Sequence, residues 1–97
     1  MSEGYRLLGA FLDSSLAAVA SYTVSPHIIL GRELLIHDMV TRTEAQGSGY
    51  ASALLRELER IAKDLGCGRV FVHTRNASVF YRRNHYQEYS TGMIKIL

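Results

Sequence analysis

This chain has few of the features that cross-link a small protein or direct it to a membrane. Its 97 residues include one cysteine, one proline and no tryptophan. A single cysteine excludes an intramolecular disulfide, and the polar start Met1–Gly4 does not resemble a signal peptide. No apolar run approaches the roughly 20 residues that a membrane-spanning helix needs. We therefore expect a cytoplasmic protein with a reduced thiol and no membrane partner.

An excess of charge of one sign is also missing. Eleven Lys and Arg residues against nine Asp and Glu residues leave a net charge of +2, which argues against a broad nucleic-acid-binding face. The histidines and Cys67 lack metal-ligand spacing, so we expect no metal site. A hydrophobic fraction of 47% is typical of a globular protein. At this length there is room for one core, so residues 1–97 are expected to form a single domain.

Apolar runs separated by turn signals predict strands in the first half of the chain. Tyr5–Leu12 stops at an Asp-Ser-Ser turn, and Leu16–Val24 stops before Ser25-Pro26, which together predict an antiparallel hairpin. Residues 16–20 would also suit a helix. Glu33–Thr41 predicts a third, unusually apolar strand.

The clearest predicted element is a helix that follows residue 49. Apolar side chains recur there at three- and four-residue spacing: Ala51, Leu54, Leu55, Leu58, Ile61, Ala62 and Leu65. Gly66 is placed to end this helix, and Arg69–Thr74 is a β-prone run. Strand, helix and strand in this order predict a right-handed parallel crossover. A short helix over Ala77–Asn84 and a last strand over Tyr86–Leu97 complete the predicted α+β domain.

The loop before this helix combines glycines with a helix start. Gly47 and Gly49 allow a ligand to approach the main chain, and the helix start offers unpaired N–H groups and a positive dipole end, which favour a phosphate. A dinucleotide-binding loop would need a third glycine where Ser52 stands, and a Walker loop would need Gly-Lys-Ser/Thr. Neither motif is present.

Gln46-x-x-Gly49-x-Ala51 resembles the Gln/Arg-x-x-Gly-x-Gly/Ala signature of the GNAT family of N-acetyltransferases. Residues 32–41 resemble the family strand that precedes the signature, and residues 51–55 resemble its Gly-Ser-Ala-Leu-Leu helix opening. Phe80–Tyr86 is similar to the family's Phe-Tyr-x-x-x-Gly-Phe, with His85-Tyr86 in place of Gly-Phe. The resemblance covers about residues 32–97.

The resemblance implies a mixed, mostly antiparallel sheet with one parallel crossover, in the order β-β-β-α-β-α-β. The usual N-terminal strand and helices would be lacking. It also implies acetyl-CoA as acetyl donor and a primary amine, on a small molecule or a protein, as acceptor. The cofactor-binding residues it implies are Met39, Val40, Thr41, Gln46, Gly47, Ser48, Gly49, Tyr50, Ala51 and Ser52.

For the chemistry, the resemblance implies Tyr81 as the acid that protonates the departing thiolate, and His37 stands where the family often has a glutamate base. Neighbouring strand residues point to opposite faces, so His37 and Asp38 share a face only if a bulge intervenes. Two other readings stay open: a non-catalytic acyl-CoA-binding or assembly module, and a generic nucleotide-phosphate binder.

Without N-terminal helices, one face of the first hairpin would be uncovered. Its candidate apolar residues are Leu7, Phe11, Val19 and Tyr22, in some combination. An exposed apolar face invites association, so we expect a homodimer or a higher homo-oligomer.

Overall fold

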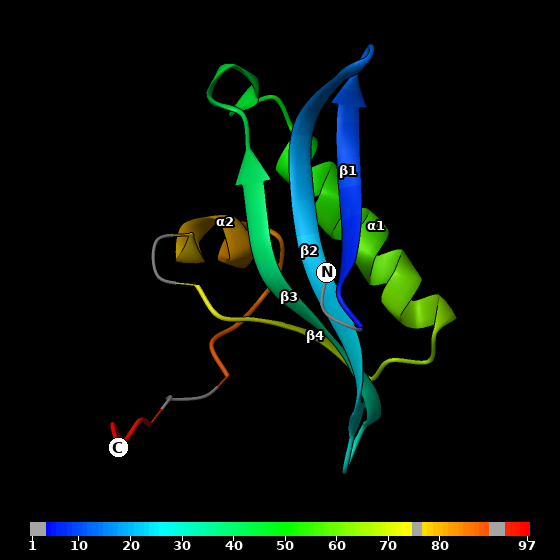
Figure 1. Cartoon of the computed structure of the whole chain (residues 1–97), viewed down its shortest axis with the longest axis vertical. Coiled ribbons are helices and arrows are strands. Elements are labelled where there is room, and N and C mark those ends of the chain that lie inside the picture. The colour runs from blue at the N-terminus through cyan, green and yellow to red at the C-terminus, as the bar shows by residue number, and fades with distance from the viewer. Residues whose placement is uncertain (1–3, 75–76, 90–92) are drawn as a thin grey trace.

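The computed structural model describes residues 4–74, 77–89 and 93–97. A sheet of four strands in the order β1-β2-β3-β4 forms its centre. The strands are β1 (Arg6–Leu12), β2 (Ser15–His27), β3 (Gly31–Thr41) and β4 (Arg69–Val72). The first three pair antiparallel, whereas β3 and β4 run parallel (Figure 1). The predicted hairpin, third strand and parallel crossover are therefore confirmed, as is the predicted α+β fold class.

One helix covers one face of the sheet. Helix α1 (Tyr50–Asp64) follows a 3₁₀ turn, η1 (Thr43–Ala45), and lies behind β1, β2 and β3 in Figure 1. Its buried side chains are Leu54, Leu55, Leu58 and Ala62, all on the predicted apolar stripe. They pack with Leu34 and Ile36 of β3 into the core. Complete burial of a leucine such as Leu58 contributes about 2 kcal/mol.

Helix α1 ends at the glycine that the sequence predicts. Gly66 has φ +75°, and the N–H of Cys67 donates to the carbonyl of Ala62 at 2.8 Å. The Gly66 N–H donates to the carbonyl of Lys63 at 3.1 Å. This pair of hydrogen bonds is the Schellman motif, which satisfies two of the last helix carbonyls and turns the chain toward β4.

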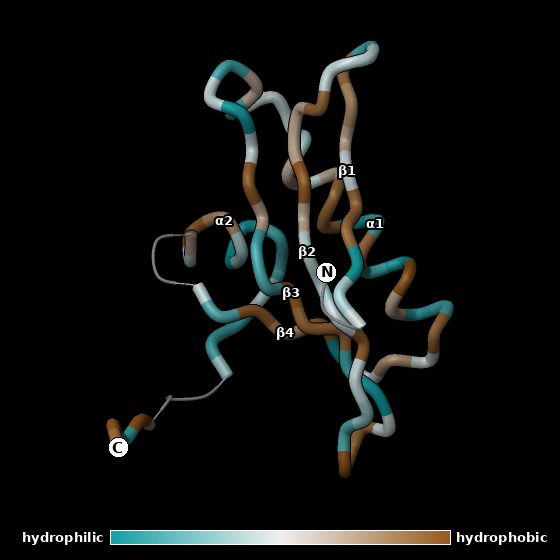
Figure 2. Tube along the Cα trace, viewed as in Figure 1, coloured by the Kyte–Doolittle hydropathy of each residue, from teal (hydrophilic) through white to brown (hydrophobic). Residues whose placement is uncertain are grey.

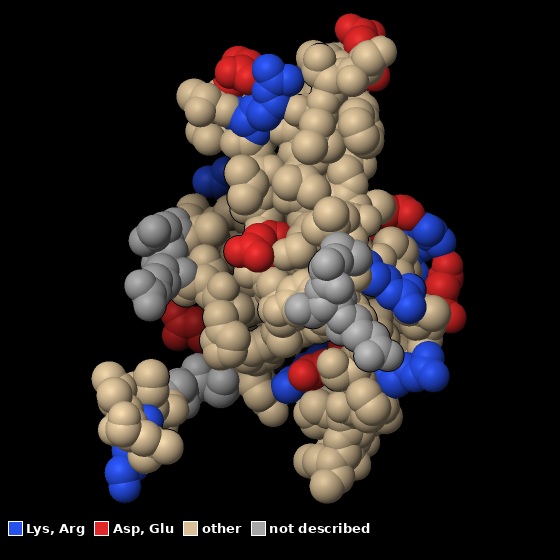
Figure 3. Space-filling model, viewed as in Figure 1, with Lys and Arg blue, Asp and Glu red and all other residues tan. Residues whose placement is uncertain are grey.

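The second face of the sheet, turned away from α1, is here called the open face. It faces the viewer in Figure 3, which shows few charged side chains over the strands. Leu7 and Phe11 are 63% and 62% exposed there, and Val19 pairs with Gly9 on the same face. Tyr22 is different: it is only 6% exposed and packs in the core against α1. Its inclusion among the candidate uncovered residues was wrong, because it alternates with Ser21, which faces the open side.

Two bulges interrupt the antiparallel pairings. Between β1 and β2 the extra residue is Ala17, and between β2 and β3 it is His37. An extra residue reverses the alternation of faces beyond it. The second bulge therefore sets which β3 side chains reach the open face near the end of that strand.

The predicted last strand is wrong for the residues that the structure describes. Helix α2 (Ser78–Arg83) is present where a short helix was predicted, but residues 84–89 and 93–97 are not in a strand. Residues 90–92 of the predicted strand lie outside the described residues. β4 ends at Val72, two residues before its predicted end, so it offers a short edge for a further strand to pair with.

Candidate functional site

The loop between β3 and α1 presents main-chain donors in one place. The first hydrogen bond of α1 runs from the Ala53 N–H to the Gly49 carbonyl at 3.0 Å. The N–H groups of Tyr50, Ala51 and Ser52 precede it in the first turn and have no main-chain acceptor within the described residues. The loop therefore directs a set of unpaired donors outward at the positive end of the helix dipole.

Nothing in α1 itself neutralises this positive end. No side chain caps the helix, and no acidic residue occupies its first turn. Most helices place Ser, Thr, Asp or Asn at the cap, where Gly49 stands here. An external anion would supply both the missing acceptor atoms and the missing negative charge.

Gly47 and Gly49 leave the approach to these donors open. Their φ angles are +81° and +88°, in the left-handed region that favours glycine. A Cβ atom built at either position would meet no atom within 4 Å. The space that side chains would occupy is therefore free for a ligand.

Two of the predicted donors are used inside the loop instead. The Gln46 N–H donates to the Thr43 carbonyl and the Ser48 N–H donates to the Ala45 carbonyl, each at 3.3 Å. The Gln46 side chain reaches back to the Thr41 carbonyl, with Nε2 3.4 Å from the oxygen. Gln46 thus anchors the loop to the end of β3, and the donors left for a ligand belong to Gly47, Gly49 and the first turn of α1.

The strands β3 and β4 separate beside this loop. Their parallel pairing ends at Ile36 and Val72, but β3 continues to Thr41. Met39, Val40 and Thr41 still pair with β2 on their other side. Their edge toward β4 is therefore without a β4 partner, and Val40 is 60% exposed. The three predicted cofactor-binding residues of β3 therefore lie on strand backbone with spare hydrogen-bonding groups.

The β3 bulge brings His37 and Asp38 to one face. Thr23 Oγ1 lies 2.8 Å from His37 Nε2, and Ser21 Oγ donates to Asp38 Oδ2 at 3.0 Å. Ser21 and Thr23 are two apart in β2 and both face the open side, so both β3 side chains do too. The Tyr5 ring lies against the His37 ring, with centroids 4.7 Å apart. The condition for a shared face is met, so Asp38 joins His37 as a candidate site residue, one that the sequence did not single out.

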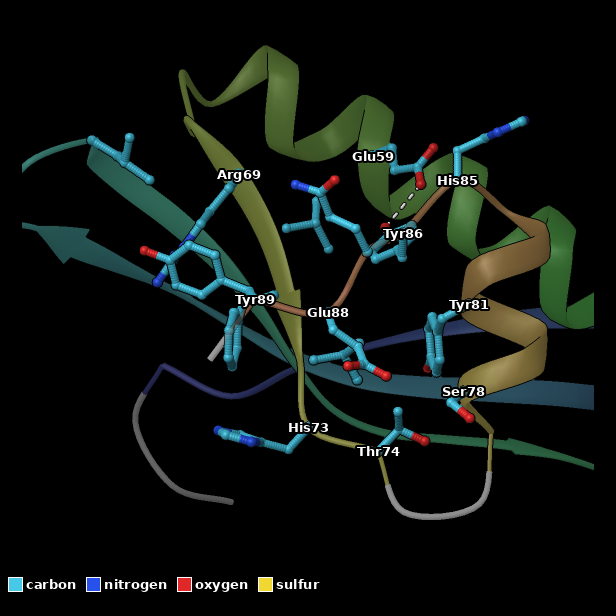
Figure 4. A pocket seen from close by; sticks show the side chains of 15 residues that line it. Glu59, Arg69, His73, Thr74, Ser78, Tyr81, His85, Tyr86, Glu88 and Tyr89 are labelled. Carbon is cyan, nitrogen blue, oxygen red and sulfur yellow. Dashed lines mark hydrogen bonds between the residues drawn. The ribbon is translucent and has the colours of Figure 1, made fainter. Parts of the chain in front are cut away.

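Tyr81 lies on the other side of the sheet. It projects from α2 into the core cluster and is only 7% exposed (Figure 4). Burial raises the pKa of its hydroxyl above the ordinary tyrosine value. The hydroxyl is therefore a proton donor, not a base, at neutral pH. His37 and Tyr81 approach the sheet from opposite faces, and the separation of β3 and β4 lies between those faces.

A second tyrosine holds Tyr81 in place. The Tyr86 ring packs on the Tyr81 ring with centroids 5.5 Å apart, and the Tyr86 hydroxyl donates to Glu59 Oε2 of α1 at 2.8 Å (Figure 4). Burial and the Glu59 carboxylate raise the pKa of Tyr86. Tyr81, Tyr86 and Glu59 line a pocket of about 780 Å³ between β4, α2 and residues 85–89. Of the predicted catalytic residues, Tyr81 lines this pocket and His37 does not. None of the predicted cofactor-binding residues lines it.

The turn after α2 keeps the geometry that a glycine would give. His85 has φ +71°. The Tyr86 N–H donates to the Tyr81 carbonyl at 2.9 Å, and the His85 N–H donates to the Arg82 carbonyl at 3.0 Å. This is a second Schellman motif, with a histidine in the left-handed position. The Thr74 hydroxyl accepts the Ala77 N–H at 3.0 Å at the start of α2. Both ends of the segment that carries Tyr81 are thus fixed.

The described residues do not support a metal site, a membrane-spanning helix or a reactive cysteine. No group of three or more His, Cys, Asp and Glu side chains is arranged there to hold a metal ion. Neither described helix is both long enough and apolar enough for a membrane crossing. Burial raises the pKa of the Cys67 thiol, which disfavours its reactive thiolate form.

Comparisons with known proteins agree with this geometry. Residues 1–88 match the model of a family described as the acetyltransferase (GNAT) family. No curated protein matches the sequence. Among solved structures, a transcriptional regulator from Bacillus halodurans C-125 superposes with a TM-score of 0.86 at 20% identity, covering 99% of this chain and 68% of that one.

Two further solved structures are named as acetyltransferases. Glucosamine-6-phosphate N-acetyltransferase from Arabidopsis thaliana gives a TM-score of 0.84 at 19% identity, over 96% of this chain and 67% of that one. Ribosomal-protein-alanine N-acetyltransferase from Brucella melitensis biovar Abortus 2308 gives a TM-score of 0.79 at 18% identity. The match covers 96% of this chain and 72% of that one. At these identities the likeness shows the fold. The chain spans about two thirds of the length of these neighbours.

Proposed function

The chain belongs to the GNAT family of acetyltransferases, and we propose that it transfers an acetyl group from acetyl-CoA to a primary amine. The observation that carries this proposal is the pairing of two features at one end of the sheet. Unpaired main-chain donors at the start of α1 suit a pyrophosphate, and the separated ends of β3 and β4 suit the pantetheine arm.

The conformation of the loop between β3 and α1 suits a bound diphosphate. Gly47 and Gly49 adopt conformations that favour glycine and leave open space at their Cα atoms. Gly47, Gly49 and the first turn of α1 would hold the diphosphate, while Gln46 and Ser48 shape the loop through their internal hydrogen bonds. Tyr50 is half-buried against the core, so its main chain and not its ring would meet the ligand.

The chain's own residues then divide the remaining work. Bound acetyl-CoA supplies the acetyl group as a thioester, which is activated toward amines. Met39, Val40 and Thr41 would position the arm, with a β3 N–H near Val40 oriented toward the thioester oxygen. Tyr81, held protonated by burial, would give its proton to the departing thiolate sulfur. His37 would accept the amine proton, directly or through water, from the open face.

A second candidate function is a non-catalytic acyl-CoA-binding or assembly module. The chain spans only about two thirds of its structural neighbours, so the acceptor site would be built from less protein. In this reading the donor loop is retained but His37 and Tyr81 have no chemical role.

Binding of acetyl-CoA is the first test. Free ligand at one hundred times its dissociation constant should stabilise the fold by about 2.7 kcal/mol, measurable as a rise in melting temperature. ADP should stabilise it less than CoA does, since it lacks the arm that enters between β3 and β4. If ADP stabilises the fold as much as CoA does, the protein is a generic nucleotide-phosphate binder. If acetyl-CoA, CoA and ADP all fail to stabilise it, the proposed site is refuted.

Tyr81→Phe separates the enzyme from the module. If Tyr81 is the general acid, this substitution should lower kcat by about 10²- to 10⁴-fold with little change in acetyl-CoA affinity. The matched control is Tyr86→Phe, which removes the hydroxyl of the neighbouring ring that donates to Glu59. Turnover that is the same in Tyr81→Phe and wild type would exclude the acid role. Tight acetyl-CoA binding with no turnover across a panel of amines would favour the module.

A further inference from the structure

The His37 side chain forms its hydrogen bond within the described residues through one ring nitrogen. The Thr23 hydroxyl oxygen Oγ1 lies 2.8 Å from His37 Nε2, and both residues are half-buried. His37 Nδ1 has no hydrogen-bond partner among the residues that the structure describes. The two ring nitrogens therefore have different surroundings, and Nδ1 is the one left for a further proton.

The direction of the hydrogen bond between Thr23 and His37 decides whether His37 can act as a base. If the Thr23 hydroxyl donates to Nε2, the neutral ring carries its proton on Nδ1, and neither nitrogen can accept another. If the hydroxyl accepts, the ring proton is on Nε2 and the lone pair of Nδ1 is available. In that arrangement the protonated ring also keeps its bond to Thr23, as a charge-assisted hydrogen bond.

The two strands hold this side-chain pair in a fixed geometry. Thr23 pairs with Leu35 in the β2–β3 ladder, and its branched Cβ restricts its side-chain rotation. The Tyr5 ring packs against the imidazole with centroids 4.7 Å apart. In Figure 2 a hydrophilic stretch interrupts the otherwise hydrophobic middle of β3. A polar group in such a position is costly unless it has a partner, and Thr23 supplies one to His37.

The charged and titratable groups on the neighbouring strands have partners of their own. Asp38 accepts a hydroxyl of β2 at 3.0 Å, and Glu33 Oε2 accepts from Arg69 Nε at 2.7 Å. His73, which follows β4, packs edge-on against the Phe71 ring with centroids 4.9 Å apart. None of them contacts His37 Nε2 through a hydrogen bond in the described part of the chain, so Thr23 alone sets the state of that nitrogen.

We propose that Thr23 is a positioning residue whose Oγ1 accepts the Nε2–H of His37 and keeps Nδ1 as the atom that takes the proton of the acceptor amine. The amine N–H bond breaks, and its electron pair remains on nitrogen to form the bond to the acetyl carbon. The electrons of the C–S bond leave with the thiolate, which Tyr81 protonates. This inference rests on the proposed acetyl transfer and names the atom that receives its proton.

Nitrogen-15 NMR of histidine-labelled protein tests the hydrogen bond without any turnover. At about pH 8.5, where unperturbed histidines are neutral, wild type should carry the His37 ring proton on Nε2, in slow exchange with water. The signal is assigned by its absence from His37→Gln. It should be lost in Thr23→Val and kept in Thr23→Ser, which retains the hydroxyl. A wild-type ring proton on Nδ1, or an unchanged spectrum in Thr23→Val, would overturn the inference.

Steady-state kinetics tests the role of Thr23 in proton transfer. Thr23→Val should lower kcat by about 10- to 100-fold, the effect of one charge-assisted hydrogen bond, with the KM for acetyl-CoA unchanged. Thr23→Ser should restore most of the rate. The matched control is Ser25→Ala, which removes a hydroxyl two residues further along β2 and should turn over as wild type does.

The kinetic inference is overturned if Thr23→Val keeps the wild-type rate, if Thr23→Ser is as slow as Thr23→Val, or if Ser25→Ala is equally slow. Because the NMR measurement needs no substrate, it separates failure of this inference from failure of the proposed function. The expected spectrum in a wild-type protein that acetylates no amine would support the hydrogen bond and refute the acetyl transfer.

Discussion

Substitution of Gly49 by alanine separates backbone strain from ligand contact at the start of α1. Gly49 has φ +88°, and an added Cβ would meet no atom within 4 Å. The substitution therefore destabilises the folded protein only through the strain of a left-handed alanine backbone. That strain costs about 1–2 kcal/mol, and a stiffer unfolded chain offsets about 0.4–1 kcal/mol of it. We expect a net loss of about 1 kcal/mol, a melting temperature lowered by about 4–8 °C, and acetyl-CoA affinity reduced tenfold or more.

Gly66→Ala is the matched control for this substitution. Gly66 flanks the other end of the same helix at φ +75°, again with no atom within 4 Å of an added Cβ. Its stability loss should therefore be similar, but its affinity for acetyl-CoA should stay at the wild-type value. Urea unfolding measures the first quantity and calorimetric titration the second. The reasoning fails if both variants bind acetyl-CoA equally, whether both are weakened or neither is.

Two further predictions concern the segment after α2. His85→Gly should raise the free energy of unfolding by about 1 kcal/mol in a urea titration, because His85 adopts φ +71° and a glycine relieves that strain; an unchanged or lower value would contradict this. Tyr86→Phe should cost about 1 kcal/mol at neutral pH, since it removes the hydroxyl that donates to Glu59. Burial raises the native pKa of Tyr86, so wild-type stability should fall as pH rises above about 10, where the unfolded tyrosine ionises. The same decline in Tyr86→Phe would show that Tyr86 does not cause it.

Local patterns were sufficient to predict the helix and the crossover. The apolar spacing of α1 predicts its buried face, since Leu54, Leu55 and Leu58 are in the core of the folded chain. Gly66 predicts the C-terminal end of the helix because a left-handed residue is required there. These features depend on residues within a few positions of one another, which is the range over which a sequence pattern carries structural information.

The C-terminal prediction was wrong because a strand also needs a partner. Met93–Leu97 is apolar and β-prone, and these residues are more than 85% exposed wherever the structure gives a value for an apolar side chain. Strand propensity reports how well side chains fit a pleated, half-buried surface, not whether one is nearby. The four residues of β4 offer only a short edge, and the described residues 86–89 pass beside it without forming a ladder.

Some of the candidate site could have been predicted from spacing and some could not. Glu59 follows Leu55 by four positions and Leu58 by one, which places it at the border of the apolar stripe of α1 and within reach of a core tyrosine. Asp38 gave no comparable signal. Simple alternation puts it on the opposite face from His37, and nothing in the residues around the two marks an extra position in the strand.

The bulge at His37 has two effects that the proposed chemistry needs together. By adding one residue to β3, it directs both His37 and Asp38 to the open face, where Thr23 and Ser21 orient them. It also follows directly on Ile36, the last residue of β3 that pairs with β4, and a bulge bends its strand and increases its twist. The bulge thus lies where the pairing of β3 with β4 ends, and a bend of β3 at this point would turn it away from β4. One extra residue thus links the opening proposed for the pantetheine arm to the placement of the groups proposed to receive the amine proton.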